Sequence, residues 1–150
     1  MQQDDWRRPD DATGMYPMEI AALAAEAGFP WLSANDEDGL TVLEVEAPFG
    51  PLFLVLGSSD RHGSFHFLYA RVLVGVADAA ATARQLHEAD PHGPIAQAPR
   101  PKVLSLMRVF IMDRDDTPRE LPAWLVRVAG EFAMALRLVR AWQAAAPGSG

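Results

Sequence analysis

Residues 117–142 read TPRELPAWLVRVAGEFAMALRLVRAW. This stretch opens with Thr117, Pro118 and Glu120, the pattern of a capping box with proline at the first helical position. About 25 residues at ~1.5 Å each predict a helix about 37 Å long, enough to cross a whole β-sheet. Apolar residues recur every three or four positions, as on one face of an α-helix; the expected core-facing residues are Leu121, Leu125, Val128, Phe132, Ala135, Val139 and Trp142.

Upstream of this helix, β-strand patterns alternate with turns and with two shorter helical patterns. Helices are predicted over 17–28 and 78–89 because proline and aspartate stand at their starts and glycine or proline follows their ends. Strands are predicted over 29–34, 40–47, 52–56, 64–76 and 103–112. The proline-rich segment 93–102 leaves open whether a short strand covers 95–98. The order of elements predicts an α+β fold in which an antiparallel meander is followed by a helix, further strand(s) and a long C-terminal helix.

Length and composition fit one domain. The chain has 150 residues, of which 49% are hydrophobic, enough for one core that buries about two-thirds of the unfolded surface. Polar residues without sustained periodicity predict a flexible arm over 1–14, and AAAPGSG predicts a flexible tail over 144–150. The expected domain therefore spans 15–143.

Composition also excludes several classes of function. Cysteine is absent, which rules out disulfides and thiolate metal sites. The chain contains no apolar run long enough to span a bilayer, and its polar, acidic start does not resemble a signal peptide, so we expect a cytoplasmic protein without a membrane partner. The net charge is -7, and a negatively charged protein is repelled by the phosphate backbone, which argues against direct nucleic-acid binding.

No stretch specifies a catalytic chemistry. The nucleotide-binding, zinc-protease and nucleophile-elbow motifs are absent, and Ser58 and Ser59 lack a signature that ties a base to them. His62 and His66 are the only close histidine pair, but a spacing of four at a loop-to-strand junction does not place both rings on one face. We therefore expect no enzyme activity, no metal and no cofactor.

The strands carry more apolar residues than is typical of an antiparallel sheet with one face exposed to solvent. Residues 52–56, LFLVL, are apolar on both faces of their strand, and 65–76 and 103–112 nearly so. One long helix covers mainly one face, so the other face is expected to need a partner. The alternative is that the first two helices cover one face and the long helix covers the other.

The pattern resembles the YbjN-like family, whose fold is that of the type III secretion chaperones. The matching stretches are 18–28, 40–76, 103–112 and the closing helix from Thr117, which together make up most of the chain. The resemblance implies a homodimer that binds, shields or delivers other proteins. It implies no catalytic residues.

These observations lead to a functional hypothesis. We expect a non-enzymatic, chaperone-like homodimer whose negative field favours basic clients, of which a DNA-repair or single-stranded-DNA-binding protein is one candidate class. The alternative is a small regulatory domain that senses a ligand under the long helix, with His66, Tyr69 and Arg108 as the polar residues to inspect. The residues expected to contact a partner are Glu44, Glu46, Leu52, Leu54 and Leu56.

Overall fold

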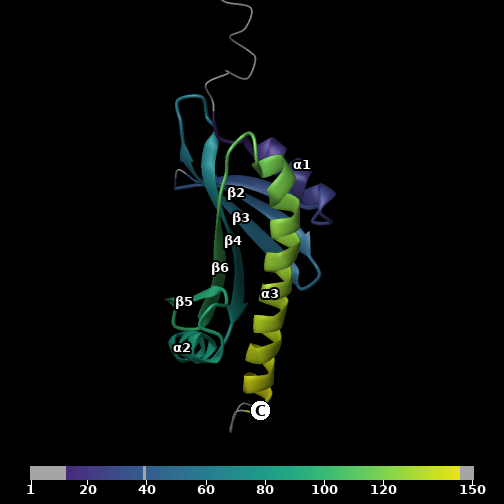
Figure 1. The fold of residues 1–150 in the computed structure, drawn as a ribbon. Coiled ribbons are helices and arrows are strands. Elements are labelled where there is room, and N and C mark those ends of the chain that lie inside the picture. Colours follow the sequence, from purple (N-terminus) through teal and green to yellow (C-terminus); the bar gives the residue numbers. More distant parts are fainter. Residues whose placement is uncertain (1–12, 39, 146–150) are drawn as a thin grey trace, which may run out of the picture. The chain divides into compact units, whose positions relative to one another are not determined.

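The computed structural model describes residues 13–38 and 40–145 (Figure 1). Its described part is α+β, with a six-stranded antiparallel sheet and three helices, the last of them long. In chain order the elements are α1 (Pro17–Glu26), β1 (Trp31–Glu37), β2 (Leu40–Ala47), β3 (Gly50–Ser59), β4 (Phe65–Gly75), α2 (Ala79–Ala89), β5 (Ile95–Arg100), β6 (Val103–Ile111) and α3 (Thr117–Ala145).

The sheet resolves the question that the sequence left open at 93–102. Its strand order is β1-β2-β3-β4-β6-β5, so β5 is an edge strand. It is longer than the short strand considered, and it pairs antiparallel with β6, with a register shift between Gln97 and Arg100. Pro99 lies within that irregularity. Proline is tolerated there because an edge strand needs backbone donors on one side only.

The chain packs as two compact units. The described residues of unit 1 are 13–38, 40–70 and 109–125, and those of unit 2 are 71–108 and 126–145. Strands β4 and β6 and helix α3 each contribute residues to both units. That 15–143 forms a single folding domain stays a prediction.

The predicted arm and tail are partly corrected. Residues 1–12 and 146–150 lie outside the described residues, but Thr13 and Gly14, which the arm included, belong to the described part of unit 1. The carbonyl of Thr13 accepts a hydrogen bond from the Arg114 amide at 2.9 Å. Gly14 is buried so tightly that a Cβ there would stand 2.3 Å from the Phe65 carbonyl oxygen. At the other end, Ala144 and Ala145 belong to α3 rather than to a tail.

The helix cap at Thr117 also differs from the prediction. Thr117 is the first residue of α3, and its buried hydroxyl accepts the Asp113 amide at 2.8 Å. The Asp113 carboxylate in turn accepts the Asp116 amide at 2.6 Å. Asp113 and Thr117 thus satisfy the turn before the helix, where the sequence predicted a capping box between Thr117 and Glu120.

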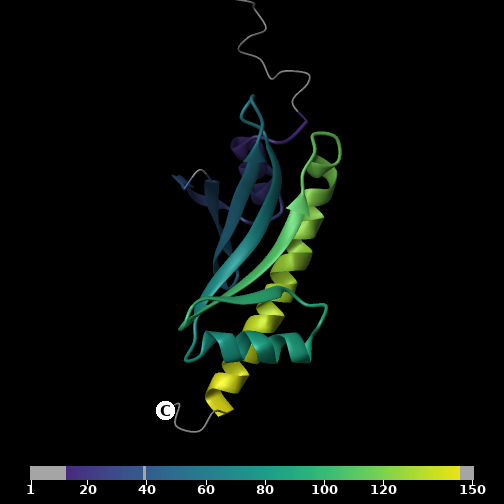
Figure 2. The ribbon, with the colours of Figure 1, turned by 90° about the vertical axis from the view of Figure 1, so that its left-hand side faces the viewer.

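In unit 1, helices cover one face of the strands. Figure 1 places α1 and the first turns of α3 on the same side of these strands, and α1 contacts β1 and β2. The strand residues that point to this side are fully or almost fully buried, namely Leu43, Val45, Leu52, Leu54, Leu56, Leu68 and Ala70. Figure 2 shows that no helix described in unit 1 lies over the opposite face.

Unit 2 contains α2, the β5–β6 hairpin and most of α3. Helix α2 begins after Asp78, whose carboxylate accepts the Ala81 amide at 3.1 Å as an N-cap, and the helix packs on β5. In α3, Val128, Phe132 and Val139 are buried, as are Leu121 and Leu125 in the part that belongs to unit 1. The helical stripe read from the sequence is therefore the apolar side of α3 as far as Val139, whereas Trp142, which the stripe included, is partly exposed.

The substitution Phe132→Ala is expected to lower the free energy of unfolding by about 3 to 5 kcal/mol, because removing a fully buried phenyl ring leaves a cavity. Urea denaturation followed by far-UV circular dichroism measures the change. Val126→Ala, at a position of α3 that is 56% exposed, is the control and should change the midpoint little. Equal midpoints for the two variants would show that Phe132 is not in the core.

Candidate functional site

One face of the strands of unit 1 has no helix described in that unit over it. Its first part lies on β2 and β3, where directly paired residues point to the same side of the sheet. Glu44 pairs with Phe53 and Val42 pairs with Val55. These residues alternate with the buried leucines of both strands and therefore occupy the opposite, helix-free face. We call this surface the open face.

Strand β4 extends the open face with aromatic side chains. The Phe67 ring lies over Gly57 of β3, so closely that a Cβ on Gly57 would stand 2.4 Å from the ring. An aromatic side chain laid over a strand glycine covers backbone that the glycine leaves bare. By alternation Phe65 and Tyr69 point to the same side, and all three are partly exposed.

Strand β6 adds the most exposed part of the open face. Val109 is 47% exposed and Ile111 is 74% exposed. Between them Phe110 points the other way, toward the helices, where its ring lies 5.0 Å from the ring of Trp124 in α3. The open face is thus an apolar, partly aromatic surface that spans several strands of unit 1.

This placement corrects the choice of partner-binding residues on β3. Leu52, Leu54 and Leu56, expected to contact a partner, are each 0% exposed and belong to the covered face. Successive side chains of a strand point to opposite faces of the sheet. Phe53 and Val55 therefore lie on the open face, where the leucines had been expected. Both faces of β3 are apolar, and the sequence alone could not tell which one the helices cover.

Glu44 and Glu46 do lie on the open face, near its acidic border. Glu44 accepts a hydrogen bond from the Ser33 hydroxyl at 3.3 Å, and Glu46 is exposed opposite Pro51. The end of β1 and the turn after it add further negative charge: Asp36 of β1 accepts the Thr41 hydroxyl at 2.8 Å, and Asp38 in the turn adopts a left-handed backbone with φ 50°. An apolar surface with carboxylates at its border has the composition of a protein interface with a polar rim.

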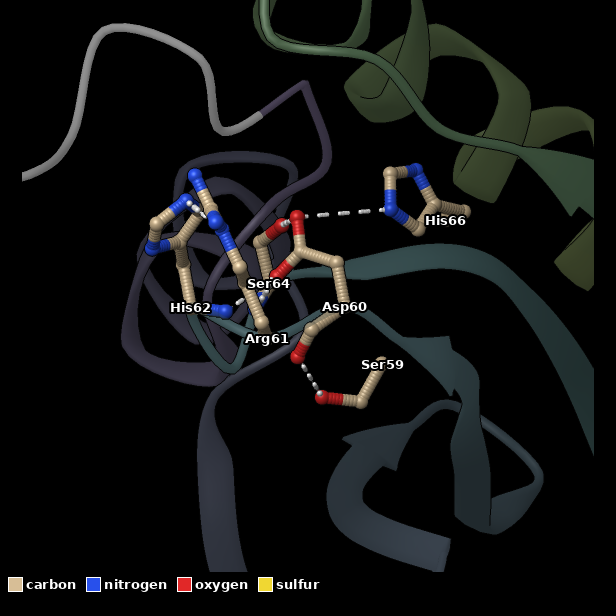
Figure 3. Close-up of polar contacts among 6 residues, drawn as sticks. All are labelled: Ser59, Asp60, Arg61, His62, Ser64 and His66. Carbon is tan, nitrogen blue, oxygen red and sulfur yellow. Dashed lines mark hydrogen bonds and ion pairs between the residues drawn. The ribbon is translucent and has the colours of Figure 1, made fainter.

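The connection between β3 and β4 is organised by one carboxylate (Figure 3). Asp60 Oδ1 accepts the amides of His62 and Ser64 at 2.9 and 3.0 Å. Its Oδ2 accepts the hydroxyl of Ser64 at 2.6 Å and lies 3.6 Å from His66 Nε2. Chiefly the Ser64 hydroxyl, and then the two amides, lower the pKa of Asp60 from 3.8 to about 2.

This cluster has the residue types of a catalytic triad but not its geometry. A triad passes the proton from serine to histidine and orients the histidine through a carboxylate. Here Ser64 donates directly to Asp60, and its side chain is 0% exposed. A carboxylate with a lowered pKa is also a weaker base. The arrangement therefore fixes the conformation of the loop, and the Ser64 hydroxyl in it is not accessible.

Arg108, one of the three polar residues singled out on the strands, lies in unit 2 and is fully engaged there. Its Nε donates to Glu131 of α3 at 3.0 Å and its Nη2 donates to the His92 carbonyl at 2.7 Å. A cleft of about 110 Å³ lies beside this pair, lined among others by Leu86, Leu106 and Met134. Pockets for drug-sized ligands occupy roughly 300 to 1,000 Å³, so this cleft under α3 is smaller than the usual ligand pocket.

His66 and Tyr69 lie in unit 1 and do not converge with Arg108 on one pocket. His66 faces Asp60, its carbonyl accepts the Met112 amide at 2.7 Å, and Tyr69 is part of the open face. Among residues 13–38 and 40–145, no three histidine, aspartate or glutamate side chains group as metal ligands. No helix in the same part of the chain is long and apolar enough to cross a membrane.

Comparisons with known proteins add no assignment. A scan against protein-family models found no match, and searches of curated proteins and of solved structures found none either.

The substitution Asp60→Asn is expected to flatten the pH dependence of stability between about pH 4 and pH 2. The pKa of Asp60 is lower in the folded chain than its ordinary value, so its contribution is present above about pH 4 and is lost as the pH falls toward 2. Urea midpoints measured across this range test the expectation. Asp115→Asn, which removes an exposed carboxylate, is the control. The expectation would be contradicted if the urea midpoints of the wild-type and Asp60→Asn proteins fell equally steeply between about pH 4 and pH 2.

Proposed function

We propose that this chain is a non-enzymatic, chaperone-like protein-binding module that works as a homodimer. The observation that carries the proposal is the open face, where Phe53, Phe67, Val109 and Ile111 form an apolar surface that no helix described in unit 1 covers. Monomeric proteins rarely expose a continuous apolar surface of more than a few hundred Å². A second copy that packs its own open face on this one removes both surfaces from water.

The geometry of a sheet supports a self-complementary contact. Two sheets pack face to face about 10 Å apart with their side chains interdigitated. A two-fold dimer uses the same patch on both copies, so each apolar strand meets an apolar strand. A specific interface buries at least about 1,000 Å² in total. The acidic residues Glu44 and Glu46 would then lie toward the rim.

The order of elements supports the resemblance to the YbjN-like family and to the type III secretion chaperone fold. The chain has a helix, a four-strand meander, a helix, a two-strand return and a long final helix. Strand β5 pairs with β6, so the proline-rich segment contains the strand that the sequence analysis had left open. On this basis we infer that the module binds and shields other proteins.

The charge favours a basic client. The chain has 20 acidic and 13 basic residues, a net charge of -7, and carboxylates gather on the β1–β2 turn and along β2. Such a field accelerates encounter with positively charged proteins and repels nucleic acid. A DNA-repair or single-stranded-DNA-binding protein is one candidate class of client, and secreted substrates are another. Ligand sensing under α3 is less well supported, because the cleft there is about 110 Å³.

The dimer is tested by the mass in solution. Wild-type protein at tens of micromolar is expected to show the mass of a dimer in light scattering, and Ile111→Glu to shift it to a monomer, because it would bury a charge in the apolar interface. Val126→Glu places the same charge on an exposed position of α3 and should leave the dimer intact. A monomeric wild-type protein would contradict the proposal.

The client is tested by affinity capture with mass spectrometry. Captured proteins are expected to be basic, and their recovery should fall between about 50 and about 300 mM salt, because screening weakens attraction between exposed charges. The double change Glu44→Gln and Glu46→Gln should lower recovery further. Glu26→Gln with Glu88→Gln, two changes on helices, is the control with equal net charge. If the two double variants recover clients equally well, the carboxylates of β2 do not guide binding.

A further inference from the structure

A second hollow, distinct from the cleft under α3, lies wholly within unit 2. It has a volume of about 460 Å³ and is formed by the last residues of β4 and by the β5–β6 hairpin. This volume falls in the range of small-molecule sites, roughly 300 to 1,000 Å³. Its lining includes two arginines and several apolar residues, among them Arg71, Leu73, Gly75, Pro99, Arg100 and Val103. We call it the arginine hollow.

One of the two arginines is held in position by the sheet. Arg71 Nε donates to the hydroxyl of Ser105 at 3.0 Å, and Ser105 is 1% exposed. This bond fixes the orientation of the guanidinium group and leaves its two terminal nitrogens for another acceptor. A buried serine on a largely apolar strand thus supports a cation at the surface.

Both arginines lack a carboxylate partner within the described part of the chain. No ion pair joins Arg71 or Arg100 to any acidic residue among 13–38 and 40–145, whereas Arg108 pairs with one acidic residue and Arg119 with two. The chain has 20 acidic residues for 13 basic ones. In so acidic a chain, two unpaired guanidinium groups at one hollow are therefore a local concentration of positive charge.

The rest of the lining is apolar and accessible. Leu73 is 45% exposed, and Pro99 and Val103 border the same space. A ligand that fills the hollow would cover these side chains and remove them from water. The hollow therefore offers two guanidinium groups and an apolar surface next to each other.

We propose that the arginine hollow binds a molecule in which a carboxylate is attached to an apolar group. Arginine presents a planar fork of donors that matches the two oxygens of a carboxylate, and Arg71 and Arg100 together supply more donors than one carboxylate needs. The apolar part of the ligand lies against Leu73 and Val103. The proposal rests on other residues than the proposed function does, because the residues named for the open face belong to unit 1 and those that line the hollow belong to unit 2.

A carboxylate fits this hollow better than a phosphate. Phosphate sites commonly use the free amides of a helix N-terminus or of a glycine-rich loop. The helix that follows β4 has its first turn occupied, because the Asp78 carboxylate accepts the Ala81 amide and the Asp78 carbonyl accepts the Thr82 hydroxyl. The arginines are thus the evident anion-binding groups of the described lining.

The experiment is a titration of the isotope-labelled full chain, observed by NMR, with octanoate as the probe and octanol as its neutral counterpart. Octanoate is expected to shift the amide signals of Gly75 and Val103 in a saturable way, and octanol to shift them at least about tenfold more weakly. No saturable shift with octanoate, or equal binding of octanol, would overturn the proposal.

A peptide probe separates the two sources of such a carboxylate. A short peptide that ends in leucine with a free C-terminal carboxylate is compared with the same peptide as its amide. Tighter binding of the peptide acid than of octanoate assigns the hollow to a protein C-terminus, and the reverse order assigns it to a free amphipathic acid. Equal binding of the peptide acid and its amide would overturn the role of the arginines.

Two kinds of variant test the residues. Arg71→Gln and Arg100→Gln are each expected to weaken octanoate binding about tenfold or more. Arg84→Gln changes an exposed position of α2 outside the hollow and is expected to leave octanoate binding unchanged. Gly75 shares the strand face of Arg71 and Leu73, and a Cβ there would meet no heavy atom within 4 Å. Gly75→Leu should therefore fill the hollow and abolish binding while the urea midpoint stays near that of the wild type. Undiminished binding by Gly75→Leu and by both arginine variants would place octanoate elsewhere.

Discussion

Unequal cover of the two faces of the unit 1 sheet is the constraint on which the rest of this structure depends. Helices α1 and α3 bury one face, and the leucines of β2 and β3 on that side are 0 to 1% exposed. The strands carry apolar side chains on the other face as well, including Phe53 and Phe67. Apolar area left in water costs about 25 cal/mol per Å² relative to burial, and this cost is what drives the proposed association.

Polar side chains of the strands and of their connections differ in how many of their hydrogen-bonding positions the protein itself occupies. The Asp60 carboxylate accepts from two amides and one hydroxyl and has His66 nearby, so it is committed to shaping a loop. Arg108 is likewise committed to Glu131 and to a carbonyl. Arg71 is different, because Ser105 orients it without neutralising it. This distinction separates structural polar groups from one that is positioned for a ligand.

Much of the fold could be predicted from the sequence because local patterns set the elements. The order of helices and strands follows from hydrophobic periodicity and from turn residues, and the stripe from Leu121 to Val139 is the buried side of α3. The misses have local causes. Pro99 left the edge strand β5 open, although an edge position tolerates a missing donor. Asp113 and Thr117 make the bonds of the turn before α3, where a capping box between Thr117 and Glu120 was expected.

The candidate sites show where prediction from sequence stops. By itself the sequence determined the α+β class, the acidic charge, the long helix and the excess of apolar strand surface, because each is a property of composition or of spacing along the chain. Only the tertiary structure decided that Leu52, Leu54 and Leu56 lie inside while Phe53 faces out. Only the tertiary structure placed Arg71 and Arg100 at one hollow. The buried face of β3 depends on which side of the sheet the helices cover, and the hollow depends on strand pairing between distant residues. No local sequence pattern encodes helix cover or strand pairing.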